Sequence, residues 1–403
     1  MTQARDIAIL GSGIMGSSAA LALAACGARV TLFDAAERPF QAASRWNEGK
    51  IHLGYLYSAN PDLETARHIL PGGLEFKRLT ERYIGRPIDA AVTSHDDTYL
   101  VHRDSVTSVA SMEKYMRDVD ALLDGHPLAH GYLIDLTERR SRRLSTAELD
   151  RNYDTKEVAA GFCVPERSVA TVWIADQFVR ALEAEPKIEL ALNSRVTGVR
   201  TIAGSLQGPF QIDTDCGSSG PYDLVINCLW EGRPIIDAAL GILPPAPWSH
   251  RFRLSLFLRT AEPMSVPSTV IATGPFGDIK QYSGRDFYLS WYPAGLRAEG
   301  TDLAPPPLPE IEAGGESIIE EVFRGLGTII PGVKHLRDKA ETIQLSGGWV
   351  YASSQGSLSH PASTIHRRHH TNIIRASSYI SIDTGKYSIA PWLAQRVAAA
   401  ICG

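Results

Sequence analysis

A glycine-rich segment near the start of the chain, 11–16, has the spacing GxGxxG. It lies between a short apolar segment and an alanine-rich segment, and a second apolar segment then ends at Asp34. This order predicts a strand, a tight turn, a helix and a second strand, with the phosphates of a dinucleotide bound by the unpaired N–H groups at the start of the helix. Asp34 would accept hydrogen bonds from the adenosine ribose and repel a 2′-phosphate, which argues against NADP.

Each glycine has its own function in this turn. Gly11 permits the sharp change of direction, Gly13 leaves room for a pyrophosphate, and Gly16 lets the helix lie close to the strand. Ile14 and Met15 lie within this turn, before the helix expected from about Ser17 to Cys26, and are candidates for binding the same cofactor. The alternative is a doubly wound sheet in which the glycines serve only packing.

The segment 43–55, which follows the second strand, is dense in polar side chains, glycines and aromatic residues. With this loop, the sequence resembles the FAD-dependent amine and amino-acid oxidase family that includes D-amino acid oxidase, glycine oxidase and monomeric sarcosine oxidase. In that family the loop runs past the FAD pyrophosphate and then along the isoalloxazine ring. The resemblance therefore implies FAD as the cofactor, bound noncovalently unless His52 attaches it.

The resemblance also assigns roles to particular residues of the loop. It places these residues beside the cofactor: Ser44 and Arg45 near the phosphates, and Asn47, Gly49 and Lys50 along the flavin. His52 would face the substrate, and Lys50 and His52 would be catalytic together with Lys386. The alternative is a surface loop whose lysine and histidine only keep it solvated.

A second strand, glycine turn and helix close the chain, with the turn at Thr384, Gly385, Lys386 and Tyr387 and an apolar helix over 389–401. In the resembled family the N-terminus of this helix points at the pyrimidine ring of the flavin, and the turn donates to it. Reduction places negative charge on N1 and the C2 carbonyl of a flavin, and a helix N-terminus with Lys386 would stabilise that charge. The alternative is an ordinary helix start with a solvated lysine.

The resemblance extends to the middle of the chain, where the backbone of Val196 would lie beside the adenine. Three aromatic residues are candidates for the wall of the substrate site: Tyr288, Trp291 and Trp349. Large aromatic residues on alternating strands also serve as core, which is the alternative. Members of the family often present a Gly-Arg-Pro turn to the substrate near 344–351. This chain has no Arg-Pro there, which argues against a simple α-amino-acid carboxylate at that position.

The length of 403 residues exceeds what one hydrophobic core supports and predicts two domains. The resemblance implies an α/β plus α+β fold, with a Rossmann-type FAD-binding domain assembled from discontinuous segments and a second, mixed and largely antiparallel β-sheet domain for the substrate. The FAD-binding domain would comprise 1–80, 155–245 and 340–403, and the substrate-binding domain 81–154 and 246–339. The helical pattern over 65–83 contains Pro71, Gly72 and Gly73, which predicts two helices joined at that break.

Charge and composition narrow the function classes. A net charge of −5 and a pI near 6.2 give no electrostatic reason to bind nucleic acid or an anionic membrane. We expect no signal peptide and no membrane span. Five cysteines without a CxxC pair predict reduced thiols and a cytoplasmic location. The histidines of 360–370 lack the spacing of a metal site, so we expect no metal, and Arg367 or Arg368 is a better candidate there for an anion contact with substrate.

These observations predict an FAD-dependent oxidoreductase that transfers hydride to flavin N5 from a C–H bond of a small amine or amino-acid-like substrate. The electron acceptor is oxygen or another molecule. The loop contains no paired carboxylates, and no strong base is needed if the amine arrives neutral. The alternatives are an FAD-dependent 2-hydroxy-acid dehydrogenase or oxidase, a flavin hydroxylase, an NAD-dependent dehydrogenase, and a flavoprotein without catalytic activity.

Overall fold

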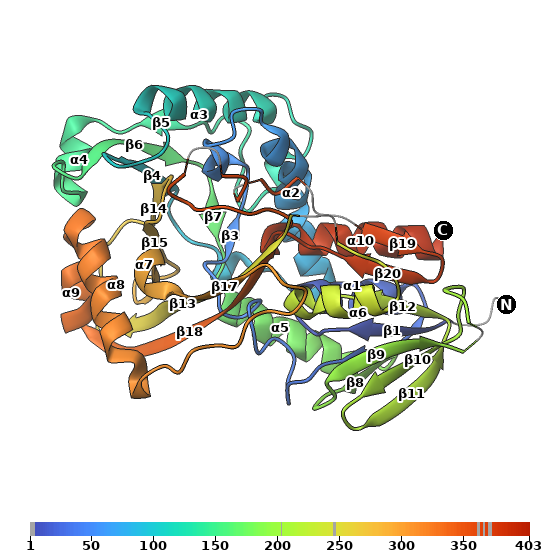
Figure 1. Ribbon diagram of the computed structural model, residues 1–403. Helices are drawn as coiled ribbons and strands as arrows, with labels where there is room; N and C mark the ends of the chain where they lie inside the picture. Colours follow the sequence, from blue (N-terminus) through green and yellow to red (C-terminus); the bar gives the residue numbers. More distant parts are fainter. Residues whose placement is uncertain (1–4, 203, 245–246, 361–362, 366, 370–372) are drawn as a thin grey trace.

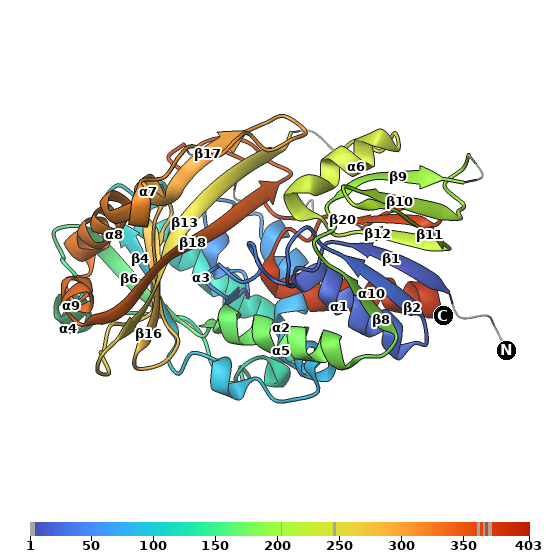
Figure 2. The ribbon, with the colours of Figure 1, turned by 90° about the horizontal axis from the view of Figure 1, so that it is seen from below.

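A computed structural model describes residues 5–202, 204–244, 247–360, 363–365, 367–369 and 373–403. Two large β-sheets dominate it, a six-stranded sheet on the right of Figure 1 and a nine-stranded sheet on the left. Helices and loops fill the region between the sheets and cover their outer sides (Figure 2). The expected combination of a parallel nucleotide-binding sheet and a largely antiparallel second sheet is confirmed.

The six-stranded sheet has the order β19-β20-β12-β1-β2-β8. Its strands are β1 (Asp6–Leu10), β2 (Arg29–Phe33), β8 (Ile188–Ala191), β12 (Leu224–Asn227), β19 (Ile373–Ala376) and β20 (Tyr379–Ile382). All neighbours are parallel except β19 and β20. The central strands are continuous apolar runs because both faces of the sheet are covered.

Four helices pack on one face of this sheet: α1 (Ile14–Ala25), α2 (Glu64–Ile84), α5 (Thr171–Ala184) and α10 (Ala390–Cys402). A small antiparallel sheet covers the other face: β9 (Val196–Thr201), β10 (Phe210–Thr214) and β11 (Gly217–Tyr222). Every residue of α1 from Ile14 to Ala24 is buried, which explains why this helix shows no polar face in the sequence.

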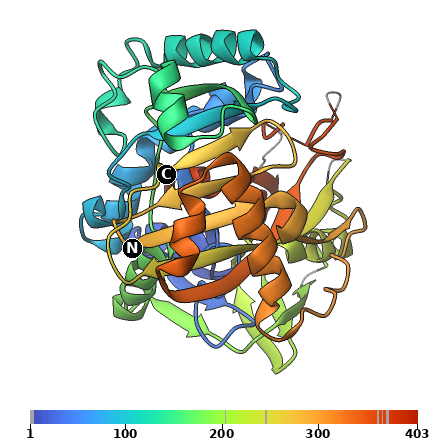
Figure 3. The ribbon, with the colours of Figure 1, turned by 90° about the vertical axis from the view of Figure 1, so that its left-hand side faces the viewer.

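The nine-stranded sheet has the order β17-β13-β16-β15-β14-β4-β6-β5, with β18 paired to β13. Its strands are β4 (Asp97–His102), β5 (Arg142–Arg143), β6 (Val158–Val164), β13 (Ser249–Thr260), β14 (Thr269–Ala272), β15 (Gly277–Gln281), β16 (Asp286–Trp291), β17 (Leu296–Gly300) and β18 (Ala340–Ala352). Two helices, α8 (Glu316–Ile329) and α9 (Val333–Asp338), cover its outer side, as Figure 3 shows from that side.

Alternation along β13 gives the nine-stranded sheet two different faces. Leu254 and Leu256 belong to the core under α8 and α9. Arg251, Arg253 and Phe257 have the opposite parity and lie on what we call the inner face. The ring of Phe257 lies 5.1 Å from that of Trp46, so the inner face meets the loop that follows β2.

The remaining elements connect these layers. The short helices and strands are α3 (Val109–Leu123), α4 (Thr146–Asn152), α6 (Arg233–Ala239), α7 (Tyr292–Gly295), β3 (Lys50–Ile51) and β7 (Arg167–Ser168). The 3₁₀ turns are η1 (Tyr55–Tyr57), η2 (Asp89–Ala91), η3 (Ala129–Gly131), η4 (Trp230–Gly232), η5 (Ala313–Gly315) and η6 (Tyr387–Ile389). In the part of the chain that the structure describes, no helix is long and apolar enough to cross a membrane.

The expected break in the helix over 65–83 is wrong, because α2 runs continuously from Glu64 to Ile84 with Pro71 inside it. The two glycines that follow the proline serve close packing. A Cβ at Gly72 would lie 2.6 to 2.9 Å from atoms of Ile389, and one at Gly73 would overlap the carbonyl oxygen of His52. The Pro-Gly-Gly sequence therefore marks the place where α2 packs against Ile389 and the backbone of His52, not the end of a helix.

Two strands depart from the domain division expected from the sequence. β6 and β18 belong to the nine-stranded sheet, although both fall in segments expected in the FAD-binding domain. We keep the two-domain division as a proposal, with these two strands assigned to the substrate-binding half.

Replacing Gly72 by alanine should destabilise the protein, because the added Cβ overlaps Ile389. Overpacking of this kind lowers the free energy of unfolding by about 1–3 kcal/mol. Gly131→Ala is the matched control, since no atom lies within 4 Å of a Cβ at that position. Denaturant unfolding followed by circular dichroism measures both variants, and equal midpoints would contradict the close packing of α2 against the C-terminal turn.

Candidate active site

The opening turn is built so that its backbone approaches other backbone closely. Gly11 has φ +94°, and a Cβ there would lie 2.8 Å from the carbonyl oxygen of Cys228. A Cβ at Gly16 would overlap the carbonyl oxygen of Gly11. At Gly13 a Cβ would meet Ser44 Oγ at 2.8 Å, and this hydroxyl accepts a hydrogen bond from the N–H of Ile14 at 3.0 Å. Ser44 therefore lies at the N-terminus of α1, as expected for a residue near phosphates.

Asp34 is held at the carboxyl end of β2. Its Oδ2 accepts hydrogen bonds from the N–H of Ser12 at 2.8 Å and the hydroxyl of Ser12 at 2.6 Å, and its Oδ1 accepts from the N–H of Ala36 at 2.9 Å. A carboxylate has about four acceptor sites, so Asp34 keeps one for a further donor. The N–H of Ser194 donates to the carbonyl of Asp34 at 2.8 Å, which brings the start of β9 at Val196 to the same end of the sheet.

The loop after β2 is fixed by its own polar groups. Asn47 bonds the carbonyl of Ala43 at 2.8 Å and accepts from the N–H of Gly49 at 2.8 Å, so its side chain closes the loop on itself. Arg45 pairs with Asp176 of α5 at 2.9 Å. The charge of Arg45 is therefore already neutralised by a protein group, and its expected place near the phosphates stays a prediction.

Lys50 is buried and lies between two carboxylates. Its Nζ binds Asp97 Oδ2 and lies 3.8 Å from Glu166, and Lys280 Nζ binds the same Asp97 oxygen at 2.7 Å. Burial alone would lower the pKa of Lys50, but the charges of Asp97 and Glu166 outweigh it and raise the pKa. Burial lowers the pKa of Lys280 to about 8, despite the attraction of Asp97. Lys50 is thus a buried cation, not a solvated loop lysine.

Glu166 fixes the backbone beyond His52. Its Oε1 accepts from the N–H groups of Leu53 at 2.6 Å and Gly54 at 3.1 Å, and its Oε2 accepts from the hydroxyl of Tyr99 at 2.5 Å. His52 itself is 2% exposed, and its Nδ1 has no hydrogen-bond partner among the described residues. Burial and the charge of Lys386 lower the pKa of His52 well below its usual value, so the imidazole is neutral at pH 7.

The turn before the last helix, 384–387, which we call the closing turn, lies near the loop 43–55 at His52. Gly385 has φ +63°, and its N–H donates to Asp383 Oδ1 at 3.1 Å, which forms the turn before η6 and α10. Lys386 Nζ lies 5.6 Å from the ring centroid of Tyr57, and that ring lies 5.8 Å from the imidazole of His52. Burial, followed by the charge of Arg368, lowers the pKa of Lys386 to about 8. Lys50, His52 and Lys386, expected to act together, therefore belong to one electrostatic group.

The other residues of the closing turn lie as expected for a helix start. Thr384 is buried and accepts from the N–H of Lys386 at 2.6 Å through its carbonyl. Tyr387 packs against Phe76 with ring centroids 5.8 Å apart, and its hydroxyl has no partner among the described residues. Their contact with a cofactor stays a prediction.

Three arginines join Lys386 at the inner face. Arg253 lies 4.8 Å from the ring centroid of Tyr292, Arg251 donates to the Tyr292 hydroxyl at 3.3 Å, and Arg368 donates to the carbonyl of Tyr351 at 3.4 Å. Burial and the charge of Arg251 lower the pKa of Arg368 to about 10. Among the described residues, none of these four cations has a carboxylate oxygen within 4.0 Å. We call Arg251, Arg253, Arg368 and Lys386 the cation group.

The three aromatic candidates for the substrate wall do not share a face. Tyr288 lies on the inner face, and its hydroxyl accepts from Ser255 at 3.0 Å. Trp291 has the opposite parity and packs against Gly325 of α8. Trp349 pairs with Phe252, with rings 5.3 Å apart, on the face opposite Arg251 and Arg253. Trp291 and Trp349 are therefore corrected to packing residues of the other face, and Tyr288 stays a candidate.

A family comparison decides the identity of this site. The model of a family described as FAD dependent oxidoreductase matches residues 6–379. The chain belongs to the FAD-dependent oxidoreductase family. The expected family, enzyme class and FAD cofactor are therefore confirmed. A comparison with curated protein sequences gives no match.

Solved structures agree with the fold of this oxidoreductase. Glycine oxidase from Geobacillus kaustophilus is 14% identical with a TM-score of 0.67, and the match covers 100% of this chain and 95% of that chain. Iminodiacetate oxidase from Chelativorans sp. BNC1 is 17% identical with a TM-score of 0.67, covering 98% and 95%. L-alpha-glycerophosphate oxidase from Mycoplasma pneumoniae, with FAD bound, is 15% identical with a TM-score of 0.66, covering 100% and 95%.

The residues of this oxidoreductase fit FAD. The N-terminus of α1, free of side chains at Gly11 and Gly13, would hold the phosphates, and Asp34 has an acceptor site left for the ribose. The N-terminus of η6 and α10 with Lys386 would face the flavin. The chemistry of this donor set, with N–H groups and cations at both ends, suits an elongated cofactor that carries negative charge.

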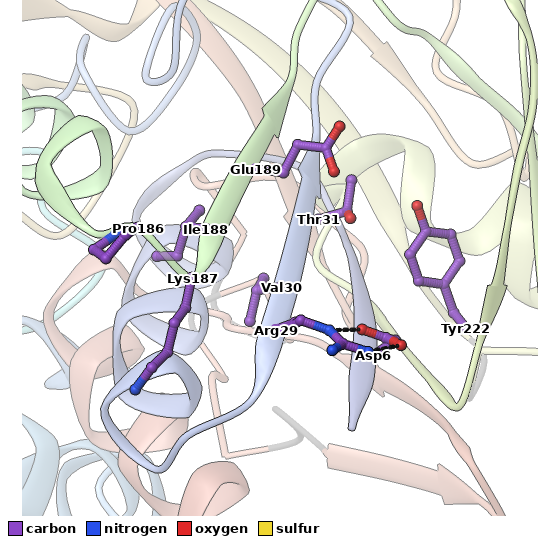
Figure 4. Close-up of a pocket in the computed structure, with 9 residues that line it drawn as sticks. All are labelled: Asp6, Arg29, Val30, Thr31, Pro186, Lys187, Ile188, Glu189 and Tyr222. Atoms are coloured by element: carbon purple, nitrogen blue, oxygen red, sulfur yellow. Dashed lines mark hydrogen bonds and ion pairs between the residues drawn. The ribbon is translucent and has the colours of Figure 1, made fainter. Parts of the chain in front are cut away.

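The groove drawn in Figure 4 is a different place. It has a volume of about 270 Å³ and is lined by Asp6, Arg29, Val30, Thr31, Pro186, Lys187, Ile188, Glu189 and Tyr222. Asp6 and Arg29, joined by dashed lines in the figure, form an ion pair at 2.5 Å at the amino ends of β1 and β2. Ligands of open α/β sheets bind at the carboxyl ends of the strands, so this groove is not the nucleotide site.

Sequence reasoning missed the charged residues supplied by the nine-stranded sheet. These are Asp97 on β4, Arg251 and Arg253 on β13, and Lys280 on β15, together with Glu166 before β7. A signal for them exists, because charged residues inside buried strands are unusual. No group of three or more metal-binding side chains lies close together among the residues the structure describes, and His366 and His370 lie outside them.

Asp34→Ala should weaken FAD binding, because it removes the acceptor at the end of β2. Loss of hydrogen bonds to a charged group corresponds to about 1.5–3 kcal/mol, or about a 10- to 100-fold rise in the dissociation constant of FAD. Asp6→Ala is the control, since Asp6 lies at the opposite end of the same sheet. Titration of the FAD-free protein with FAD, followed by flavin fluorescence, measures both. Equal affinities of the two variants for FAD would show that Asp34 does not contact the cofactor.

Asp97→Asn should strongly destabilise the fold, because it leaves Lys50 and Lys280 buried without their shared counter-ion. Breaking a buried ion pair lowers the free energy of unfolding by about 3–5 kcal/mol. Asp89→Asn breaks the exposed pair with Lys77 and should have little effect. Equilibrium unfolding in urea compares the two variants. A small loss in Asp97→Asn would show that the two lysines find other partners.

Proposed function

We propose that this oxidoreductase oxidises a small amine or amino-acid-like molecule that carries a carboxylate, at the C–H bond next to its nitrogen. The observation that supports the proposal is the cation group, four cationic side chains at the inner face without a carboxylate within 4.0 Å among the described residues. Bound FAD would supply the two-electron acceptor for that C–H bond. The protein's own residues would supply binding, orientation and electrostatics.

Buried and partly buried cations that form no ion pair are unfavourable. Since the nearby charge of Glu48 makes no contact within 4.0 Å with them, an anionic partner from outside the chain is expected as well. The FAD phosphates are not that partner, because the N-terminus of α1 provides their site on another element. The Nε atoms of Arg251 and Arg253 have no hydrogen-bond partner among the described residues, and so remain available to a carboxylate. The glycine oxidase and iminodiacetate oxidase of similar fold are named for amines that bear carboxylates.

The remaining groups would orient the substrate nitrogen. His52 is neutral and can accept or donate one hydrogen bond without repelling an amine. Lys50 is protonated and held by Asp97 and Glu166, so it would act as a fixed charge beside the flavin and not as a base. Lys386 would stabilise the negative charge of the reduced cofactor.

We leave the electron acceptor as oxygen or another small molecule, and we propose a cytoplasmic location. All five cysteines are free thiols in the structure, in agreement with a reducing compartment.

A panel of substrates mixed with the FAD-loaded protein under nitrogen tests the proposed function. Loss of the visible flavin absorbance with amino acids or N-substituted amino acids, but not with the corresponding amines that lack a carboxylate, is the expected result. Hydroxy acids of the same carbon skeleton form the second arm, and reduction by these alone would replace amine oxidation by hydroxy-acid oxidation. Readmitting air, or adding an artificial acceptor, then identifies the acceptor class.

Arg368→Met should weaken binding of an unreactive carboxylate such as acetate by about 10- to 100-fold, because it removes a charged donor worth about 1.5–3 kcal/mol. Arg367→Met is the matched control, since Arg367 is the exposed neighbour in the chain. Perturbation of the flavin spectrum by acetate measures both variants. Equal weakening in the two variants would place the carboxylate away from the cation group.

A further inference from the structure

The structure brings together two carboxylates that are far apart in the sequence. Glu48 lies in the loop two residues before Lys50, and Asp278 lies on β15 two residues before Lys280. Lys50 and Lys280 bind the same oxygen of Asp97. On the other side of Glu48, the carbonyl of Asn47 accepts a hydrogen bond from Tyr282, which follows β15, at 3.4 Å. Contacts on both sides of Glu48 therefore hold the loop against β15.

Asp278 lies on the inner face of the sheet. It pairs with Ser290 in the register of β15 and β16, and Lys280 pairs with Tyr288. Both Asp278 and Glu48 are partly accessible to solvent. The backbone of Asp278 is paired within the sheet, but its carboxylate makes no hydrogen bond or ion pair with a described residue, so it does not hold another side chain in place. An ionisable group without a structural partner on the face that carries the cation group is a candidate for chemistry.

The charged and titratable groups around Asp278 come from every element packed against it. The charged ones are Glu48 in the loop, Lys50 on β3, Lys280 on its own strand and Arg253 on β13, and the neutral tyrosines are Tyr288 on β16 and Tyr282 beyond β15. Burial and then the repulsion of Glu48 raise the pKa of Asp278 to about 6. Burial alone would raise the pKa of Glu48, but Lys386, Arg253 and Lys50 lower it. The two carboxyl groups therefore titrate apart, and Asp278 is the one that changes charge near neutral pH.

Two buried groups of the same region have no hydrogen-bond partner in the protein and are available to a ligand. The Nδ1 of His52 and the Nε of Arg251 have no hydrogen-bond partner among the described residues, and these residues are 2% and 5% exposed. The charges of Lys386, Lys50 and Lys280 all act on His52, and Glu48 acts on Lys386 and Arg253. The carboxylate pair thus lies beside the cation group. A small molecule with an ammonium group and a carboxylate could place its ammonium group at the carboxylate pair and its carboxylate at the cation group.

We propose that Asp278, with Glu48 beside it, removes the ammonium proton of the substrate before its C–H bond is broken; the inference rests on the proposed amine oxidation. One N–H bond of the ammonium group breaks and one O–H bond forms on Asp278. The nitrogen keeps the electron pair, so nothing is oxidised or reduced in this step. The partial exposure of Asp278 then lets the proton pass to solvent. No strong base is expected from the sequence for an amine that arrives neutral, and Asp278 serves as the proton acceptor for an amine that arrives protonated.

Oxidation of an amine next to its nitrogen favours a proton acceptor at the site. Amines are mostly protonated at neutral pH, and an ammonium nitrogen has no electron pair to assist loss of hydride from the adjacent carbon. A proton acceptor is most effective when its pKa lies near the working pH. Glu48 keeps its negative charge and attracts the ammonium group toward Asp278.

The pH dependence of flavin reduction by an amine under nitrogen tests the proposal. At pH 7 Asp278→Asn should reduce the flavin about 100-fold more slowly than the wild type. The difference should shrink as the pH approaches the pKa of the substrate ammonium group, because free amine then binds directly. A merely structural defect would persist at high pH. Asp286→Asn changes a partly exposed aspartate paired with Arg259 on the neighbouring strand; it is the matched control and should behave as wild type.

Infrared spectroscopy gives a readout that does not depend on turnover. The C=O band of a protonated carboxyl group should disappear as the pH rises through about 6 in the wild type and in Asp286→Asn, and should be missing in Asp278→Asn. In Glu48→Gln the same transition should move to lower pH, because a repelling charge is gone. This second variant keeps Asp278 and so tests the pairing even if Asp278→Asn fails to fold.

The outcomes separate this inference from the proposed function. If no amine reduces the wild-type flavin at any pH, amine oxidation fails and the inference fails with it. If amines reduce the wild type but Asp278→Asn keeps the same rate and pH profile, only the role of Asp278 is overturned. An infrared transition that survives in Asp278→Asn would assign the titrating carboxyl to another residue.

Discussion

The site depends on the buried carboxylate of Asp97, which binds Lys50 from the loop after β2 and Lys280 from β15. All three side chains are at most 2% exposed, so neither lysine can exchange this partner for water. A buried ion group of this kind contributes little net stability, because desolvation offsets much of the attraction. What it does here is fix position: it holds the loop against the inner face of the nine-stranded sheet, in one register.

The charged side chains around Asp97 differ in whether they have ion-pair partners in the protein. On one side, Asp97 and Glu166 neutralise Lys50 and Lys280. Asp97 Oδ2 and both oxygens of Glu166 are bonded to protein groups, whereas Asp97 Oδ1 has no hydrogen-bond partner among the described residues. On the other side, the cation group and the pair of Glu48 and Asp278 have no ion-pair partners within 4.0 Å in the described part of the chain. The groups that form ion pairs within the protein position the site, whereas the groups without an ion-pair partner are left to meet a ligand. Charges held in place before the substrate arrives need no reorganisation during the reaction.

Particular residues show which features of the fold and the site could be predicted from the sequence. The GxGxxG turn and Asp34 lie as expected, because a strand, turn and helix within thirty residues follow from local backbone preferences and apolar periodicity. Lys386 was also expected at the site, because it lies in the turn before the last helix. The break at Pro71 was not real, since tertiary packing of α2 used the glycines for close contact. Trp291 was placed on the wrong side because the parity of a strand does not say which face meets the cofactor.

The sequence by itself determined the family, the nucleotide-binding turn, the FAD cofactor and the general α/β architecture, all of which depend on neighbouring residues. Only the tertiary structure decided which charges meet. Lys50 lies 47 positions and Lys280 183 positions from the Asp97 that binds both, and the charge of Glu48 acts on Asp278 across the same junction. Contacts at such separations are set by how two sheets pack, not by local preference. The paired carboxylates therefore cannot be found in any one stretch of the chain, because each carboxylate belongs to a different sequence segment and becomes a neighbour of the other only on folding.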